Sequence, residues 1–321
     1  MHLCEWPYFL GLRLHQWWMK QHASKGPLPT VVVGNLSTGG TGKSSLLLQL
    51  TPYFLELGLQ PALLSRGYGR KNTQTDHWVQ PTDSPEQAGD EPLCFKQTFP
   101  QLQVLCAADR QKGLQQLKRL QPTPDFVWMD DGFQHLYHIP SLAMVLVTFE
   151  ELMGKQALLP VGRFREPKSA LIRAQAVIIT KIPEEETANI SLYREKLQLP
   201  AHIPLFASRY SHSLPNAFTA KKAVLITGIA KPKPLVHFLD NQGISLIHLN
   251  FPDHHAFQKK DLKSIKHYME QGLPILTTAK DQPRLHAAGI TFAQTVHVHH
   301  HFLENQLHQL IEIIRKHVGK H

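Results

Sequence analysis

One glycine-rich segment of the sequence has the composition of a phosphate-binding loop. Residues 34–45 read GNLSTGGTGKSS and lie between a short β-branched run and an apolar, helix-like stretch. Backbone N–H groups in such a loop, followed by a helix N-terminus, form a concave site for phosphate oxygens, and Lys43 adds a positive charge. Ser37 holds the place of the first glycine of the strict pattern. A chance Gly-Lys-Ser turn is the alternative, but the flanking strand and helix favour phosphate binding. The residues expected at the phosphates are Gly39, Gly40, Thr41, Gly42, Lys43, Ser44 and Ser45.

An acidic pair could hold the magnesium ion that usually accompanies such phosphates. Ser44 follows the loop lysine, where its hydroxyl would ligate the metal. The apolar run Phe126–Met129 predicts a buried strand that ends in Asp130 and Asp131. A carboxylate at the end of a neighbouring strand is the usual second ligand, although a turn or helix cap also explains an Asp pair. Which of the two carboxylates binds directly stays open.

The elements that would position these residues alternate between strand and helix. Strands that alternate with helices predict right-handed crossovers and a mostly parallel sheet. We therefore expect an α/β fold, with helices on both faces of a parallel phosphate-loop core and a second, smaller α/β domain. The expected divisions are an N-terminal helix at 1–25, the core at 26–206, a linker at 207–222 and the second domain at 223–321. The strands expected are 31–33, 61–64, 104–107, 126–129, 144–149, 176–180, 223–227, 245–250 and 274–278, and the helices 112–120, 233–241, 259–271 and 302–317.

Composition and charge exclude several protein classes. A hydrophobic fraction of 42% and a charged fraction of 18% are globular values, so a disordered or collagen-like chain is excluded. The net charge of +9 favours phosphates, anionic lipids or nucleic acid, but the sequence holds no nucleic-acid-binding motif. Cys4, Cys94 and Cys106 are few and widely spaced, which favours a reducing, cytoplasmic compartment. No apolar run is long enough to span a bilayer, and no signal peptide is evident.

The N-terminal segment Trp6–Lys20 predicts an amphipathic helix. Leu10, Leu14, Trp17 and Trp18 fall on one face of it, and basic residues lie elsewhere. That composition fits a helix lying in a membrane interface, whereas a terminal helix packed on its own domain is the alternative.

A histidine-rich tract lies near the C-terminus. Residues 297–301 read HVHHH, and their alternation with valine predicts a strand with a solvated edge. A metal site is the alternative, but no carboxylate or cysteine is interleaved.

Several motifs occur together in the order seen in one known family. They are GNLSTGGTGKS, SRGYGR at 65–70, GDEP at 89–92, DDGFQH at 130–135, LLPVGRFREP at 158–167, FPDHH at 251–255 and TTAKD at 277–281. With these motifs the chain resembles the tetraacyldisaccharide 4'-kinases of lipid A biosynthesis across residues 31–281. The departures are mild: Arg163 precedes FREP where a smaller or apolar residue is expected, and the N-terminal helix is more aromatic than basic.

The resemblance implies a P-loop kinase that uses ATP and Mg²⁺ and is built of two α/β/α units with a cleft between them. Its acceptor would be the 4'-hydroxyl of a tetraacylated glucosamine disaccharide 1-phosphate, and its product lipid IVA. Asp90 would act as general base, paired with His254 of the second domain so that domain closure assembles the pair. Arg165 would stabilise charge on the transferring phosphoryl group, and Glu91 is a further candidate metal ligand. Polar turns, a surface loop and an Arg165 salt bridge to the neighbouring glutamate are the alternatives.

The resemblance also implies a lipid substrate and a peripheral position at the cytoplasmic face of the inner membrane. The partners expected are this glycolipid and the membrane surface, with neither nucleic acid nor an obligate protein partner. A neutral core histidine is the alternative for His135. A P-loop ATPase switch acting on a protein partner is the alternative function. The residues expected at the substrate are Ser65, Arg66, Tyr68, Arg110, Gln134 and His135.

Overall fold

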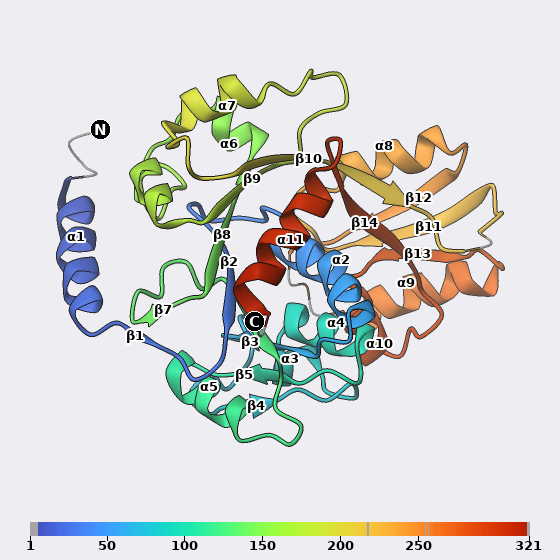
Figure 1. Cartoon of the computed structure of the whole chain (residues 1–321). Coiled ribbons are helices and arrows are strands. Elements are labelled where there is room, and N and C mark those ends of the chain that lie inside the picture. The colour runs from blue at the N-terminus through green and yellow to red at the C-terminus, as the bar shows by residue number, and fades with distance from the viewer. Residues whose placement is uncertain (1–5, 217, 254, 256, 320–321) are drawn as a thin grey trace. The chain divides into compact units, whose positions relative to one another are not determined.

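A computed structural model describes residues 6–216, 218–253, 255 and 257–319 (Figure 1). Two residues named above, Cys4 and His254, lie outside the described residues. The contacts between Cα atoms divide the chain into two compact units. The first unit contains residues 1–66, 102–210 and 300–321, and the second contains residues 67–101 and 211–299. Among the described residues, no helix has both the length and the apolar character needed to cross a bilayer.

The first unit is built on a parallel sheet. Its strands run in the order β10, β9, β8, β2, β6, β3 and β5, and each neighbouring pair is parallel. Strands β2, β6 and β8 are mainly apolar runs that are buried along their whole length, as expected for a parallel sheet covered on both faces. Their bounds are β2 (Thr30–Asn35), β3 (Pro61–Ser65), β5 (Val104–Cys106), β6 (Phe126–Asp130), β8 (Leu142–Thr148), β9 (Ala176–Thr180) and β10 (Leu205–Ser213).

Helices and short strands complete the first unit. Helix α2 packs against β3 and β6, α5 against β3 and β5, α6 against β8 and β9, and α11 against β2. Strand β1, which follows the N-terminal helix, pairs in parallel with the short strand β7. The bounds are α1 (Trp6–Gln21), β1 (Ser24–Lys25), α2 (Lys43–Glu56), α5 (Arg110–Lys118), β7 (His138–Ile139), α6 (Phe149–Met153), the 3₁₀ helix η2 (Lys168–Arg173), α7 (Ile190–Leu197) and α11 (Gln306–Val318).

The second unit has its own parallel sheet, in the order β12, β11, β13 and β14. Alternate residues of β11 enter two separate hydrophobic clusters. Ala223 and Leu225 pack with helix α8, whereas Val224 and Ile226 pack with α9 and α10. The elements are β4 (His77–Trp78), α3 (Pro85–Ala88), α4 (Asp90–Thr98), β11 (Lys222–Thr227), α8 (Lys233–Asn241), β12 (Ser245–Asn250), α9 (Lys259–Glu270), β13 (Ile275–Thr278), α10 (Gln282–Ala287) and β14 (Gln294–Phe302).

The α/β fold class predicted from the sequence is confirmed. Several elements, such as α4, α7, β10 and α10, were not expected, and others differ from prediction at their ends. Phe149 begins α6 instead of ending β8, because Thr148 caps the helix by accepting a hydrogen bond from the Glu151 amide. Phe302 ends β14, so the last helix begins only at Gln306. The region expected as a linker contains β10 from Ala207 onward, and the last five residues of that strand are only half-buried. The contacts place residues 67–101 in the second unit, whereas the sequence boundaries include them in the core.

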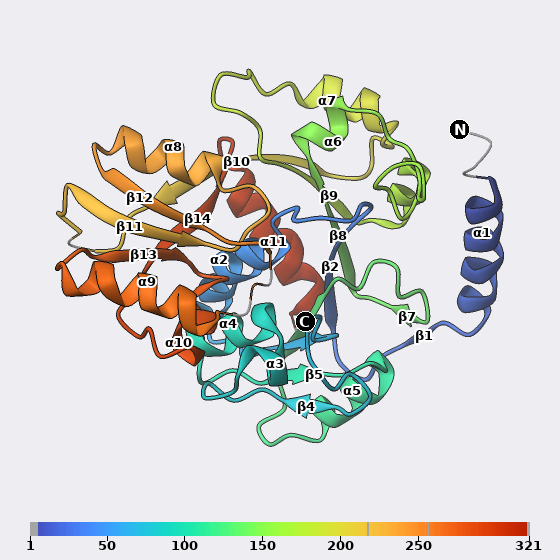
Figure 2. The ribbon, with the colours of Figure 1, turned by 180° about the vertical axis from the view of Figure 1, so that it is seen from behind.

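Helix α1 has two different faces. Both views show it at the margin of the first unit, beside the short strands β1 and β7 (Figure 1 and Figure 2). Met19 is buried, whereas Leu10, Leu14, Trp17 and Trp18 are between 50% and 63% exposed. The predicted helix is confirmed. Of the two alternatives left open by the sequence, the exposure of these four side chains favours the interfacial helix over one packed on its domain through that face. Trp18 also packs edge-on against Tyr137 with ring centroids 5.6 Å apart.

Candidate active site

The glycine-rich loop joins β2 to α2 in the first unit, and it has the backbone that only glycine adopts easily. Gly39 and Gly42 have φ angles of 132° and 99°. A Cβ atom on Gly42 would also lie 2.0 Å from the Tyr210 hydroxyl. Lys43 is the first residue of α2, so its charge adds to the positive end of the helix dipole. The predicted strand, loop and helix order is therefore present.

A buried asparagine at the end of β2 organises the space in front of this loop. Asn35 is 0% exposed, and its Oδ1 accepts hydrogen bonds from Lys43 Nζ at 3.1 Å and Arg165 Nη2 at 2.5 Å. Its Nδ2 donates to the Ser37 carbonyl at 2.9 Å, and its own carbonyl accepts from Gln134 Nε2 at 2.8 Å. Sequence reasoning missed Asn35. A polar residue ending an otherwise apolar buried strand is the signal that could have found it.

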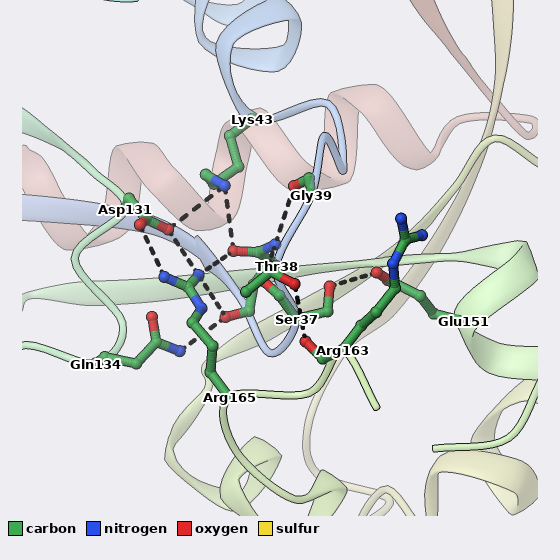
Figure 3. A network of polar contacts seen from close by, with 10 residues as sticks. Ser37, Thr38, Gly39, Lys43, Asp131, Gln134, Glu151, Arg163 and Arg165 are labelled. Atoms are coloured by element: carbon green, nitrogen blue, oxygen red, sulfur yellow. Dashed lines mark hydrogen bonds and ion pairs between the residues drawn. The ribbon is translucent and has the colours of Figure 1, made fainter. Parts of the chain in front are cut away.

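Asp131 contacts the same two cations, Lys43 and Arg165, that bond to Asn35. Its carboxylate receives two hydrogen bonds of 2.9 Å from Arg165 and lies 3.4 Å from Lys43 Nζ. Figure 3 shows both cationic side chains directed at it. Burial would raise the pKa of Asp131, but the Arg165 hydrogen bonds and the charges of Lys43 and Arg165 outweigh burial and hold this pKa well below its usual value. Asp131 is therefore ionised at neutral pH.

The Arg165 segment reaches the loop through backbone contacts. Arg165 N donates to the Leu36 carbonyl at 2.7 Å, and Thr38 N donates to the Arg163 carbonyl at 2.8 Å. An antiparallel bridge between Ser37 and Phe164 lies between these two bonds. The predicted alternative for Arg165, a salt bridge to Glu166, is wrong, since Glu166 pairs with Arg173 and Arg165 pairs with Asp131.

Hard oxygen donors for a magnesium ion lie near the loop. Asp130 ends β6 in register with Val33 of β2, so it lies at the same end of the sheet as the loop. Ser44 is the second residue of α2. Among the described residues, no three His, Cys, Asp or Glu side chains form a metal cage. Mg²⁺ bound with a nucleotide needs only one or two protein ligands besides phosphates and water, so these residues fit the ion.

A second group of cations surrounds His135. Arg110 is 4% exposed and donates to the Ala107 carbonyl at 2.5 Å. Burial lowers the pKa of Arg110, while Asp130 raises it and Arg66 lowers it. Burial and the charge of Arg110 lower the pKa of His135 to about 4, so this histidine is neutral at pH 7. Ser65, at the end of β3, accepts a hydrogen bond from Ala107 N at 3.0 Å through its carbonyl.

Two residues that were not expected at the site contact the phosphate loop. His300 Nε2 lies 3.1 Å from the Gly42 carbonyl and 3.0 Å from Ser45 Oγ. Lys181 Nζ donates to the Gly40 carbonyl at 2.5 Å. The expected strand at the histidine tract is present, and His297, His299 and His301 are exposed. The expectation of a solvated edge is wrong for His300, which is 2% exposed.

Asp90 lies in the second unit, in a buried ion pair. It is the first residue of α4. Arg284 of α10 donates two hydrogen bonds to its carboxylate, from Nε to Oδ1 at 2.7 Å and from Nη2 to Oδ2 at 2.6 Å. Arg284 also lies 3.4 Å from Asp281, whose Oδ2 accepts hydrogen bonds from Gly228 N and Thr278 Oγ1. Glu91 and Tyr68 belong to the same unit. Sequence reasoning missed Arg284, which lies three residues beyond the TTAKD motif.

Known proteins match this chain over nearly its whole length. The sequence profile of the tetraacyldisaccharide-1-P 4'-kinase (LpxK) family matches residues 3–317. A tetraacyldisaccharide 4'-kinase of Phocaeicola vulgatus is 33% identical over 310 residues, covering 88% of this chain and 83% of that protein. The enzyme of the same name from Flavobacterium johnsoniae is 35% identical over 272 residues, covering 80% of this chain and 78% of that protein. A crystal structure of LpxK from Aquifex aeolicus in complex with ATP superposes with a TM-score of 0.77 at 26% identity, covering 98% of this chain and 97% of that one.

Proposed function

The chain belongs to the tetraacyldisaccharide-1-phosphate 4'-kinase family, and we propose that it phosphorylates the 4'-hydroxyl of a tetraacylated glucosamine disaccharide 1-phosphate with ATP. The observation that carries this proposal is the convergence of Lys43, Asp131 and Arg165 on Asn35 in front of a glycine-rich loop. Phosphoryl transfer depends mainly on positioning and on neutralising charge, and this arrangement supplies two fixed cations for that purpose.

The reaction breaks the bond between the γ-phosphorus and the β,γ-bridging oxygen and forms a bond from that phosphorus to the sugar 4'-oxygen. Loop amides and Lys43 would hold the β- and γ-phosphates. Arg165 would balance charge on the transferring oxygens. Its two hydrogen bonds to Asp131 fix the direction of the Arg165 guanidinium. Mg²⁺, held by Ser44 with Asp130 or Asp131, would neutralise further phosphate charge, and Glu91 remains a candidate for its shell.

The proton of the 4'-hydroxyl needs an acceptor, and Asp90 paired with His254 is the pair we propose for it. Two hydrogen bonds from Arg284 fix the direction of the Asp90 carboxylate. The proposal requires Asp90 to reach the acceptor hydroxyl when both substrates are bound. For the headgroup and 1-phosphate of the substrate we propose Arg66 and Arg110 as charged contacts.

We propose that uncharged polar side chains make further contacts to the sugar. A neutral His135 can donate or accept a hydrogen bond to a sugar hydroxyl without repelling the neighbouring arginines. The other residues proposed for the substrate are Ser65, Tyr68 and Gln134.

A lipid acceptor places the enzyme at a membrane surface. Each CH₂ group exposed to water costs about 0.8 kcal/mol, so a four-chain lipid does not leave the bilayer readily. We propose that the exposed aromatic face of α1 lies in the headgroup region of the cytoplasmic leaflet, where the net charge of +9 also favours binding. The protein would then be peripheral.

The direct test supplies purified protein with γ-labelled ATP, Mg²⁺ and the disaccharide 1-phosphate lipid in mixed micelles. Label transferred to the lipid supports the kinase. Label released only as inorganic phosphate, with none on the lipid, contradicts it and favours an ATPase switch. A lipid whose 4'-hydroxyl is blocked serves as the matched control and should accept no label.

A further inference from the structure

We propose that Gln16 and Tyr8 of α1 are positioning residues for Arg165, so that the membrane-facing helix also sets the position of the arginine at the phosphate loop. The inference rests on the proposed function, because it assigns α1 a part in phosphoryl transfer beyond attachment to the membrane. It follows from contacts that lie entirely within the first unit.

The inner face of α1 has the spacing of a second helical stripe. Tyr8, Leu12, Gln16 and Met19 follow one another at intervals of four, four and three residues, and all are buried or half-buried. The exposed aromatic and leucine side chains lie on other faces of the same helix. One face of α1 is therefore available to lipid while the opposite face contacts the protein.

The inner face bonds directly to Arg165 and its neighbour. The Tyr8 hydroxyl donates to the Arg165 carbonyl at 2.9 Å. Gln16 Nε2 donates at 2.5 Å to Oε2 of Glu166, which is 0% exposed and also accepts from Arg173 Nη2 at 2.7 Å. Within the described residues, Oε1 of Glu166 has no hydrogen-bond partner, so Gln16 supplies one of the few bonds to this buried charge.

The same contacts extend to the loop that bears Asp131. The Arg173 guanidinium lies 4.3 Å from the centre of the Phe133 ring, two residues beyond Asp131. Trp18 of α1 packs on Tyr137, at the end of that loop. The helix therefore contacts both segments that meet in the ion pair between Arg165 and Asp131.

Because α1 touches these segments through a few polar bonds, the position of the helix and that of Arg165 depend on each other. A lipid surface that binds the outer face would favour the helical arrangement in which Gln16 and Tyr8 reach Arg165 and Glu166. Without its Gln16 bond, the buried Glu166 keeps only the ion pair with Arg173, and the next cation along the chain that could add a bond is Arg165. Arg165 should then leave Asp131 part of the time.

The experiment uses the full-length chain on vesicles that contain anionic phospholipid. Gln16→Ala and Tyr8→Phe remove the two bonds, and Gln16→Glu places a like charge beside Glu166. Gln21→Ala is the matched control, because Gln21 is an exposed glutamine on the same helix. For each variant we would measure vesicle cosedimentation, thermal melting, kcat and KM for ATP on the lipid acceptor, and hydrogen exchange of residues 163–168 and of α2.

We expect all variants to cosediment as the wild type does and to remain folded at the assay temperature, with Gln16→Ala and Gln16→Glu melting at a lower temperature than the wild type. Gln16→Ala should lower kcat about tenfold, Gln16→Glu should lower it further, and Tyr8→Phe less, with KM for ATP within about twofold. Residues 163–168 should exchange faster while α2 does not, and Gln21→Ala should match the wild type. Unchanged kcat and unchanged exchange in Gln16→Ala would overturn the inference. So would a loss of kcat that merely follows a loss of vesicle binding. If the wild type phosphorylates no lipid, the proposed function fails, but the exchange measurement still decides the positioning role.

Discussion

Replacing Asn35 by alanine would remove the side chain that joins the lysine of the phosphate loop to Arg165. The substitution removes the oxygen shared by Lys43 and Arg165 and the donor to the Ser37 carbonyl. Both cations would remain paired with Asp131. We expect a folded protein in which the two cations are no longer fixed relative to the loop.

The size of the effect follows from the two bonds to charged groups. A hydrogen bond to a charged group contributes about 1.5–3 kcal/mol. The lower figure applies here, because the Lys43 and Arg165 side chains are 14% and 25% exposed and both keep a second partner. Two such bonds amount to about 3 kcal/mol, and at 1.36 kcal/mol for each factor of ten, kcat/KM should fall roughly 100-fold.

The assay is the initial rate of lipid phosphorylation in mixed micelles across a range of ATP concentrations. Asn35→Asp is a second variant of the same size: its carboxylate would hold both cations more tightly and would repel the Ser37 carbonyl, so KM for ATP should rise. Asn241→Ala, at the exposed end of α8, is the control and should match the wild type. If Asn35→Ala melts normally and stays within about threefold of the wild type in kcat/KM, Asn35 does not organise the site.

Three further outcomes are expected. Lys43→Ala should lower kcat at least 100-fold, which is the loss typical of removing one donor that binds a developing oxyanion. Lys43→Arg should not restore kcat, and normal turnover in either variant would show that Lys43 does not act at the site. Arg284→Gln breaks the buried pair with Asp90 and should lower the free energy of unfolding by about 3–5 kcal/mol in urea, whereas an unchanged midpoint would show that the pair is not stabilising. Burial lowers the pKa of His138 to about 4, and its Nε2 lies 2.7 Å from Thr30 Oγ1. The unfolded chain therefore binds this proton at a higher pH than the folded chain does, so stability should fall as the pH drops from about 6.5 to 4. His138→Gln should flatten that part of the profile in thermal melts, and an unaltered slope would contradict the assignment.

Local sequence was enough to predict the scaffold of the site. Continuous short apolar runs such as those of β2 and β6 indicate strands buried on both faces, and their alternation with helices indicates a parallel sheet. The ends of such strands then locate Asp130 and the glycine-rich loop at one edge of the sheet. These inferences need only neighbouring residues, and the structure agrees with them.

The partners of the charged residues were not predictable in this way. Asn35 and Arg165 are 130 residues apart in the chain, and Asp90 and Arg284 are 194 apart. Nothing in the spacing of either member identifies the other, because the contact depends on how two distant segments cross. The same holds for His300, which looks like one histidine of a solvated tract until its bonds to the phosphate loop are seen.

Ser37 explains how the loop works without the first glycine of the strict pattern. That position needs no glycine here, because Ser37 is not among the residues with a positive φ angle. Its hydroxyl instead donates to Glu151 at the start of α6, and its carbonyl accepts from Asn35. Glu151 is itself fixed by a hydrogen bond of 2.9 Å from the Thr148 amide. The serine side chain thus ties the entrance of the loop to a helix cap on one side and to the asparagine on the other. A glycine would keep the backbone path but lose the bond to Glu151, so the departure from the pattern replaces loop flexibility with a fixed anchor.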